Sequence, residues 1–213
     1  SFKLDILMKV VAIVQARMGS TRLPNKVMKS ICGIPMIEIL LKRLSASKEV
    51  NEIIVATSSN DINQPLIDHV ERLGYICSQG SENNVLSRYF KTAKDYSADV
   101  VVRITGDCPL VDPDLVDDAI NKFRSLNIDY LSNNYPPTYP DGLDIEVCSF
   151  KALKQANNEA TSSFDKEHVT SYLRNEEKFK TFVFKNKQDL SKHRWTVDES
   201  ADFEIIQNIF QYF

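Results

Sequence analysis

Residues 10–26 read VVAIVQARMGSTRLPNK, an uninterrupted apolar run followed by a basic turn. Five small or β-branched apolar residues in a row are typical of a strand that is buried on both faces. The turn carries three cations, Arg17, Arg22 and Lys26. It matches neither the G-x-G-x-x-G nor the G-x-x-x-x-G-K-[ST] pattern of phosphate-binding loops. The segment therefore predicts a buried strand followed by an anion site of another kind.

The same apolar pattern recurs along the chain and alternates with helical periodicity. It predicts strands at residues 52–57, 75–77 and 99–104, and amphipathic helices at residues 35–45, 63–73, 84–96 and 114–126. Strands rich in valine and isoleucine that are each followed by a helix favour a parallel sheet covered on both faces. Right-handed crossovers then predict a doubly wound, Rossmann-type α/β fold with three layers.

The pattern becomes less regular in the last third of the chain. Here we predict a loop at residues 133–141 (NNYPPTYPD), strands at 143–147 and 181–184, and helices at 150–160, 165–175 and 202–213. We interpret residues 1–213 as a single domain, with residues 133–192 as an elaboration and residues 1–7 as an N-terminal extension. The last helix has no stop signal, which leaves open whether the natural chain continues.

The composition excludes several classes of protein. The chain has 213 residues, of which 43% are hydrophobic and 26% charged, as expected for a globular domain with a sizeable core. A net charge of −3 argues against a nucleic-acid or membrane surface, where a basic face is expected. No apolar run reaches the roughly 18 residues of a membrane span. Because the four cysteines are scattered, we expect free thiols and a cytoplasmic protein without metal-binding cysteine pairs.

Ligands of open α/β sheets bind beyond the carboxyl ends of the strands. This rule predicts that the basic loop lies close to residues 103–110 (RITGDCPL) and 195–198 (WTVD). Three cations suit a triphosphate better than a single carboxylate, because arginine holds phosphate oxygens through a planar fork. Asp107 is then a candidate Mg²⁺ ligand and Asp198 the candidate second carboxylate. The alternative for Asp107 is an N-cap or turn aspartate, a role that Asp112 and Asp114 suit better, and Asp198 is followed by Glu199 and Asp202, which could equally be helix-start residues.

Six blocks, in order over nearly the whole chain, carry a resemblance to one family. They are VQARMGSTRLPNKVM (14–28), GSENNVLSRY (80–89), VVRITGDCPLVDPDLVD (101–117), YPDGLDIEV (139–147), FDKEHVTSYLR (164–174) and RWTVDESADFE (194–204). Together they resemble the cytidylyltransferases that activate acidic sugars, such as the acylneuraminate and 3-deoxy-manno-octulosonate cytidylyltransferases. The branch associated with spore coat polysaccharide biosynthesis is the most similar. The opening loop and the G-D-C-P-L turn are specific when found together.

The resemblance implies a nucleotidyltransferase fold of the glycosyltransferase-A type, with a mostly parallel mixed sheet. It implies CTP as donor, Mg²⁺ as cofactor, pyrophosphate as product, and a homodimer as a common assembly. By matching position, it implies catalytic roles for Arg17, Lys26 and Asp107, and metal ligation by Asp107 and Asp198. It implies nucleotide binding by Gln15, Ala16, Arg17, Met18, Gly19, Ser20, Arg22, Lys26 and Arg103. It implies that the sugar or sugar-acid acceptor faces the elaboration at 133–192, through Asp141, Asp144, Glu146, Lys166, Glu167 and His168.

The resulting hypothesis is a CTP-dependent cytidylyltransferase that activates a sugar or sugar acid for surface polysaccharide biosynthesis. Two alternatives stay open. One is a glycosyltransferase that uses a nucleotide sugar, although residues 106–108 hold one aspartate instead of the usual D-x-D metal motif. The other is a non-catalytic nucleotide-binding module. The choice of sugar, and of cytosine over uracil, does not follow from these residues.

Overall fold

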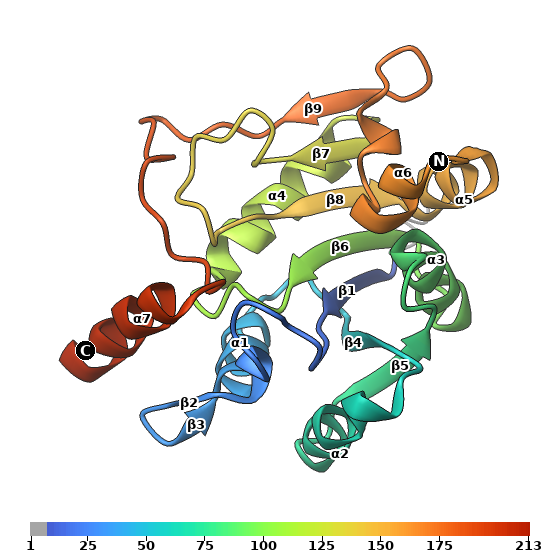
Figure 1. Ribbon diagram of the computed structural model, residues 1–213. Coiled ribbons are helices and arrows are strands. Elements are labelled where there is room, and N and C mark those ends of the chain that lie inside the picture. The colour runs from blue at the N-terminus through green and yellow to red at the C-terminus, as the bar shows by residue number, and fades with distance from the viewer. Residues whose placement is uncertain (1–7) are drawn as a thin grey trace.

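The computed structural model describes residues 8–213 (Figure 1), so the predicted extension at residues 1–7 lies outside the described residues. Within residues 8–213, the main sheet has seven strands in the order β5-β4-β1-β6-β8-β7-β9. The parallel strands are β1 (Val10–Gln15), β4 (Glu52–Ser58), β5 (Ile76–Gly80) and β6 (Val100–Thr105). The remaining strands are β7 (Tyr130–Ser132), β8 (Glu146–Ser149) and β9 (Thr181–Val183), of which β8 runs antiparallel to β6 and β7. The predicted mostly parallel mixed sheet is confirmed.

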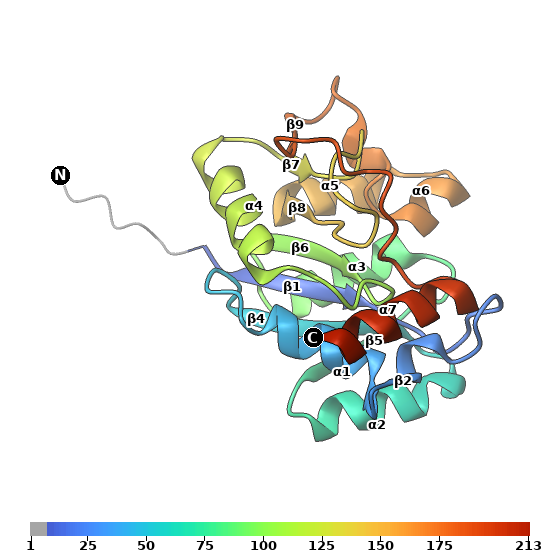
Figure 2. The ribbon, with the colours of Figure 1, turned by 90° about the vertical axis from the view of Figure 1, so that its left-hand side faces the viewer.

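Helices cover both faces of this sheet (Figures 1 and 2). One face carries α1 (Met36–Leu44), α2 (Gln64–Arg72) and α4 (Pro113–Ser125), and the other carries α3 (Val85–Asp95) and α5 (Phe150–Glu159). The three-layer α/β arrangement expected from the sequence is therefore present. Across residues 8–213, the described helices are all too short or too polar to span a lipid bilayer.

The first strand shows why the apolar run is continuous. Val10, Ala12 and Val14 pack in the cluster with α1, α2 and α4, whereas Val11 and Ile13 pack in the cluster with α3 and α5. All five side chains are fully buried. Because each buried valine or isoleucine stabilises the fold by about 1.5–3 kcal/mol, β1 is firmly held between β4 and β6, and this fixes the point where its polar loop emerges.

Side-chain caps start the helices that follow the strands. The Asp112 carboxylate accepts hydrogen bonds from the backbone N–H groups of Asp114 and Leu115, and Pro113 occupies the first turn of α4. Asn84 caps α3 in the same way, through the N–H of Ser87. Because Asp112 already caps α4, the capping alternative for Asp107 has no support in this structure.

Smaller elements surround the carboxyl end of the sheet. They are the hairpin of β2 (Ser30–Ile31) and β3 (Ile34–Pro35), α6 (Ser163–His168), α7 (Ser200–Tyr212), and the 3₁₀ helices η1 (Lys26–Met28), η2 (Asp61–Asn63) and η3 (Tyr172–Arg174). Figure 2 shows α7 beside the hairpin. There Ile206 packs with Ile31, Met36 and Val197 in a third apolar cluster. The last segment of the chain is thereby brought next to the loop after β1.

The predicted helix at residues 165–175 is wrong. The helix α6 ends at His168, and Val169 takes the left-handed φ of 59°. The Thr170 hydroxyl then donates to the buried carboxylate of Glu146 at 2.7 Å. A β-branched pair with low helix propensity therefore yields to a tertiary hydrogen bond, and η3 resumes the chain as a separate turn.

Short strands account for the other differences. The strand predicted at residues 143–147 lies instead at Glu146–Ser149. The Asn133 amide binds the Leu143 carbonyl and the Ile145 N–H, which keeps residues 143–145 out of the sheet. The strand β7 and the hairpin β2–β3 were not predicted, because two or three residues carry no measurable periodicity. The segment interpreted as an elaboration supplies β8 and β9 to the main sheet.

Gly142 provides a test of the close packing at this edge. Its φ is +109°, and an added Cβ would lie 2.5 Å from the backbone nitrogen of Thr196. Gly74 also has a positive φ, of +85°, but has no atom within 4 Å of that position. We expect Gly74→Ala to lower the free energy of unfolding by about 1–2 kcal/mol through backbone strain alone.

Gly142→Ala should lower the free energy of unfolding considerably more, because a backbone clash adds to the strain. Urea denaturation followed by circular dichroism measures both values. Equal losses in the two variants would show that the segments at 142 and 196 do not approach as closely as the structure indicates.

Candidate functional site

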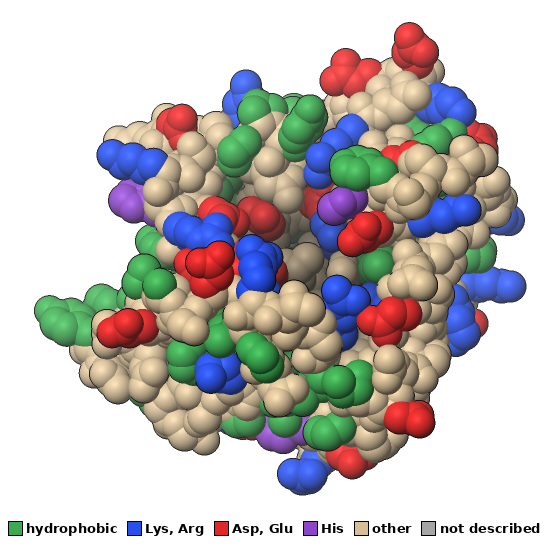
Figure 3. All heavy atoms as spheres, viewed as in Figure 1, with side chains coloured by type: hydrophobic (Ala, Val, Ile, Leu, Met, Phe, Trp, Pro, Cys, Tyr) green, Lys and Arg blue, Asp and Glu red, His purple; other side chains and the backbone are tan. Residues whose placement is uncertain are grey.

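A cleft of about 450 Å³ opens at the carboxyl ends of β1 and β6, and Figure 3 shows the hollow between clusters of basic and acidic side chains. Its walls come from the loop after β1, the turn after β6, the end of α6 and the segment before α7. The lining residues are Gln15, Ala16, Arg17, Gly19, Ser20, Thr21, Arg22, Lys26, Val27, Arg103, Thr105, Gly106, Asp107, Glu167, His168 and Asp198. The three segments that the sequence predicted to be neighbours therefore meet in one cleft.

Close backbone packing joins the first two walls. The N–H of Gly106 donates to the carbonyl of Gln15 at 2.7 Å. A Cβ at Gly106 would lie 3.0 Å from that oxygen and 3.0 Å from the Cβ of Ala16, so glycine allows the two loops to touch. The basic loop is also anchored from below, because the N–H of Met18 donates to the buried amide of Asn63 at 2.9 Å. These contacts hold Asp107 against the loop.

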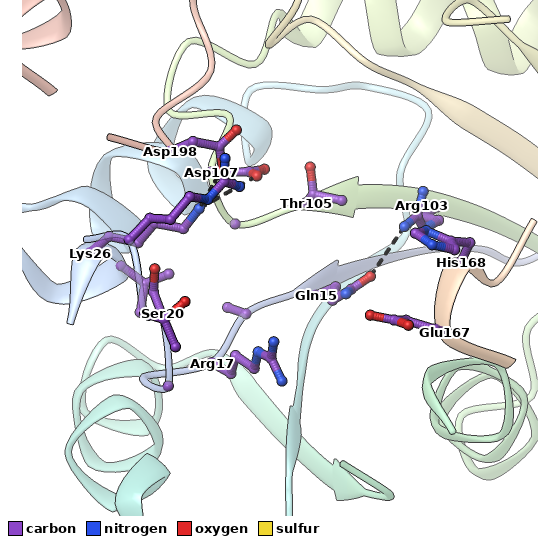
Figure 4. Close-up of a pocket in the computed structure, with 16 residues that line it drawn as sticks. Gln15, Arg17, Ser20, Lys26, Arg103, Thr105, Asp107, Glu167, His168 and Asp198 are labelled. Carbon is purple, nitrogen blue, oxygen red and sulfur yellow. Dashed lines mark hydrogen bonds and ion pairs between the residues drawn. The ribbon is translucent and has the colours of Figure 1, made fainter. Parts of the chain in front are cut away.

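Lys26 is at the centre of the charged end of the cleft (Figure 4). Its Nζ lies 3.0 Å from Asp198 Oδ1 and 3.6 Å from Asp107 Oδ2, and it donates to the Val197 carbonyl at 2.9 Å. Arg22 adds a second ion pair to Asp198 at 3.3 Å. Burial alone would raise the pKa of Asp198, but the hydrogen bond and charge of Lys26, with the charge of Arg22, outweigh burial and lower it. Asp198 is therefore held ionised.

Arg17 lies along the wall nearer to α3. Its guanidinium pairs with Glu82 at 2.9 Å and is half-exposed. The Ser58 hydroxyl also donates to Glu82, and this hydrogen bond lowers the pKa of that carboxyl, with a smaller contribution from Arg17. Arg17 therefore has a carboxylate partner on the protein and an open side toward the cleft.

Arg103 forms the opposite end of the cleft with Gln15, Glu167 and His168 (Figure 4). Its guanidinium donates to Glu146, and to Gln15 Oε1 at 3.3 Å. The guanidinium is thus fixed in orientation, with a part of it facing the cleft.

Glu146 is buried behind Arg103. It also accepts hydrogen bonds from Tyr130 and Thr170 and pairs with Arg174 at 3.6 Å. Burial alone would raise the pKa of Glu146, but the charge of Arg103 and these hydrogen bonds lower it. The carboxylate therefore stays ionised and holds Arg103 at the wall of the cleft.

Five residues predicted to contact ligands do not line the cleft. The Met18 side chain packs in the core, Glu146 is buried behind Arg103, and Asp141 pairs with Arg194 at 2.8 Å. Asp144 and Lys166 are half-buried outside the lining. Met18 and Glu146 therefore support the site from behind: Met18 packs in the core beneath the loop, and Glu146, the cross-strand partner of Arg103 in the sheet, is buried behind its guanidinium.

Several residues around the cleft were missed by sequence reasoning. Thr21, Thr105 and Gly106 line it, and Gly106 could have been found from its place between a buried strand and an aspartate. Glu82 and Arg194 act through ion pairs with Arg17 and Asp198. No local pattern marks these two residues, because each partner is distant in sequence or lies across a loop.

The acidic pair can be tested for its fit to a divalent ion. Between residues 8 and 213, the structure shows no group of three or more His, Cys, Asp or Glu side chains arranged to hold a metal. Asp107 and Asp198 nevertheless approach the same ammonium group. Two carboxylates suit Mg²⁺, which takes one or two from the protein and completes its shell with substrate phosphates and water. The neighbouring Cys108 is buried and its pKa is raised by burial, so it is not a reactive thiol.

Comparisons with known proteins agree with this geometry. The sequence profile of a family described as cytidylyltransferase matches residues 11–208. The uncharacterized protein MJ1063 of Methanocaldococcus jannaschii is 37% identical, covering 97% of this chain and 85% of that protein. The spore coat polysaccharide biosynthesis protein SpsF of Bacillus subtilis is 32% identical, covering 95% of this chain and 86% of that protein. A solved cytidylyltransferase structure from Leptospira borgpetersenii superposes with a TM-score of 0.93 at 34% identity, covering 97% of this chain and 88% of that one.

Asp144 gives a prediction about pH. Burial, and then the charge of Asp141, raise the pKa of Asp144 to about 6. A carboxyl whose pKa in the folded state exceeds its unfolded value of about 3.9 destabilises the fold when it ionises. This destabilisation is absent below the unfolded pKa and fully present above the folded one.

We therefore expect Asp144→Asn to raise the free energy of unfolding near about pH 7.5, and the difference from wild type to shrink toward about pH 4. Urea denaturation at several pH values measures this. Asp118→Asn, at an exposed position on α4, is the control. A gain for Asp144→Asn that does not change with pH would contradict the raised pKa.

Proposed function

Because the chain belongs to the cytidylyltransferase family, we propose that this nucleotidyltransferase uses CTP to activate a sugar or sugar acid and releases pyrophosphate. The observation that carries the proposal is the charged end of the cleft. There the Lys26 ammonium lies 3.0 Å from Asp198 and 3.6 Å from Asp107, with Arg22 beside them. Cations and carboxylates packed this closely suit a triphosphate bound together with a divalent ion.

The proposed reaction is a direct displacement. A hydroxyl oxygen of the acceptor forms a bond to the α-phosphorus of CTP, and the bond from that phosphorus to the bridging β-phosphate oxygen breaks. The hydroxyl proton passes to solvent, and pyrophosphate carries away the negative charge. The work of the protein is to position the reactants and to stabilise charge.

The basic loop supplies most of this stabilisation. Arg17 is suited to the α- and β-phosphates, and Arg22 and Lys26 to the leaving pyrophosphate. Gly19 lets the backbone come close to phosphate oxygens, because it has no side chain to keep them away. Because the loop is anchored at Met18 and Gly106, little ordering is needed on binding.

Asp107 and Asp198 are the proposed holders of Mg²⁺. When bound, the ion neutralises phosphate charge and polarises the α-phosphate. The two carboxylates come from distant parts of the chain, and Asp198 is held ionised by Lys26 and Arg22. Lys26 contacts both carboxylates, so it links the metal side of the site to the phosphate side.

The end of the cleft at Arg103 is the proposed acceptor side, because Arg103, which the resemblance assigned to the nucleotide, lies with Glu167 and His168 away from the Lys26 end. A guanidinium fixed by Glu146 and Gln15 suits the carboxylate of a sugar acid, while Glu167 and His168 suit its hydroxyl groups. The similarity to a protein named for spore coat polysaccharide biosynthesis supports a role in surface polysaccharide synthesis. A glycosyltransferase has no specific observation in its favour. A cytoplasmic location and a homodimer stay predictions.

Asp107→Asn tests the metal side. Loss of a carboxylate that holds the ion should lower the rate of pyrophosphate release by about 100-fold or more, with the fold intact. The assay uses CTP and a panel of sugar acids. Asp112→Asn is the matched control, since Asp112 only caps α4. The control should lose up to about 1 kcal/mol of stability and keep its activity. A normal rate in Asp107→Asn would remove the metal assignment.

Lys26→Ala tests the phosphate side. The variant should bind CTP more weakly, because the ammonium beside the two aspartates is lost. Thermal stabilisation by each common ribonucleoside triphosphate, with and without Mg²⁺, measures this, since a ligand of the folded state raises its stability. Lys29→Ala is the control, because Lys29 lies over the Phe203 ring at 5.2 Å. A larger response of the wild type to another nucleotide would contradict CTP as donor.

A further inference from the structure

Arg194 joins three aspartates behind the charged end of the cleft. Its Nη1 contacts Asp141 Oδ2 at 2.8 Å, and its Nη2 contacts Asp198 Oδ2 at 3.1 Å. Its Nε and Nη2 bind the two oxygens of Asp202 at 2.8 and 3.0 Å. A planar guanidinium can make all these contacts at once because its N–H groups point outward in fixed directions. Arg194 itself is absent from the lining of the cleft.

Asp202 fixes the backbone beneath Asp198. Its Oδ2 accepts the N–H of Asp198 at 2.9 Å and the N–H of Glu199 at 3.0 Å. The contact to Glu199 belongs to the capping box that starts α7, and the contact to Asp198 extends it by one residue. The backbone from which the Asp198 side chain extends is therefore held by the same carboxylate that Arg194 holds.

The two oxygens of Asp198 consequently have different surroundings. Oδ2 is bound by Arg194, whereas Oδ1 faces Lys26 at 3.0 Å and Arg22 at 3.3 Å. Rotation of the carboxylate would break the contact to Arg194. The arrangement leaves one defined oxygen directed at the cleft.

Arg194 also connects the Asp198 carboxylate to Asp141, and backbone hydrogen bonds reinforce this connection. The N–H of Asp141 donates to the His193 carbonyl at 2.9 Å, and the N–H of Trp195 donates to the Asp141 carbonyl at 2.6 Å. Further along, the N–H of Val197 donates to the Asp107 carbonyl at 2.8 Å. The segment from 193 to 198 is thereby held between Asp141 and Asp107.

We propose that Arg194 is a positioning residue, which with Asp202 orients Asp198 so that Oδ1 points into the cleft, and that this orientation sets the affinity of the site for a divalent cation. The inference rests on the proposed function, because it needs Asp198 as a metal ligand. In this inference Arg194 acts by holding Asp198 and does not itself contact the substrate.

Charge and orientation predict opposite effects when Arg194 is removed. If Arg194 acted only through its charge, its loss would leave the surrounding carboxylates more negative, and a divalent cation would bind more tightly. If Arg194 acts by orienting Asp198, its loss weakens cation binding even though a positive charge has gone. Arg194→Lys keeps the charge but lacks the fork, so orientation predicts weaker binding there as well.

The experiment titrates Mn²⁺ into the full chain in the presence of saturating α,β-methylene-CTP, with bound Mn²⁺ measured by electron paramagnetic resonance. We expect Arg194→Gln to raise the Mn²⁺ dissociation constant by about 10-fold, as for other residues that orient metal ligands, and Arg194→Lys to raise it as well. Nucleotide affinity in EDTA should stay within about 2-fold of wild type, because a residue behind Asp198 does not touch the phosphates.

Arg124→Gln is the matched control, because Arg124 pairs with Glu49 near the far end of α4 and should leave Mn²⁺ binding unchanged. Thermal melting of each variant reports folding separately. Mn²⁺ binding in Arg194→Gln that is unchanged or tighter than in wild type overturns the inference. Asp198→Asn distinguishes failure of this inference from failure of the proposed function. Wild-type Mn²⁺ binding in that variant would overturn the assignment of Asp198 as a metal ligand.

Discussion

The ammonium of Lys26 between Asp107 and Asp198 is the interaction on which the site depends. It joins the loop after the first strand, the turn after β6 and the segment before the last helix. Bringing two carboxylates together is unfavourable unless a cation lies between them. Lys26 supplies that cation, and Arg22 and Arg194 hold the carboxylate of Asp198 from two further sides. Without this compensation the turn after β6 and the segment before α7, which carry Asp107 and Asp198, would repel each other.

The close approach of backbones makes this contact possible. Gly106 lets the turn after β6 touch the loop after β1, and Gly142 lets the 141–142 loop touch residues 195–196. Both glycines lie where a side chain would meet backbone atoms at 3.0 Å or less. The sheet beneath is held by apolar packing on both faces, so the polar loops above it are carried on a rigid support.

Two arginine–carboxylate networks define the two ends of the cleft. At one end Glu146 is buried and holds Arg103, and at the other Arg194 is half-exposed and holds Asp198. The roles of acid and base are exchanged between the two networks. The buried Glu146 orients the basic Arg103, whereas Arg194 orients the acidic Asp198. Each arrangement presents one charged group to the cleft with its partner behind it. Arg103 therefore suits an anion at one end, whereas Asp198 beside Lys26 and Arg22 suits a cation that is bound together with phosphates at the other.

The sequence by itself determined the parallel half of the sheet, the helices that cover it and three of the four segments that form the cleft. Runs such as residues 10–14 have only one stable environment, and parallel strands place their carboxyl ends together. Only the tertiary structure decided which side chains face the cleft. Glu146 is buried and Met18 lies in the core. Arg194 binds Asp198 directly, and Asp202 at the start of α7 holds the backbone of Asp198. These outcomes depend on contacts between residues distant in sequence, such as Thr170 on Glu146, which ended a predicted helix. Periodicity reports the environment of a segment, whereas the direction of a single charged side chain is set by the partner it meets in the folded chain.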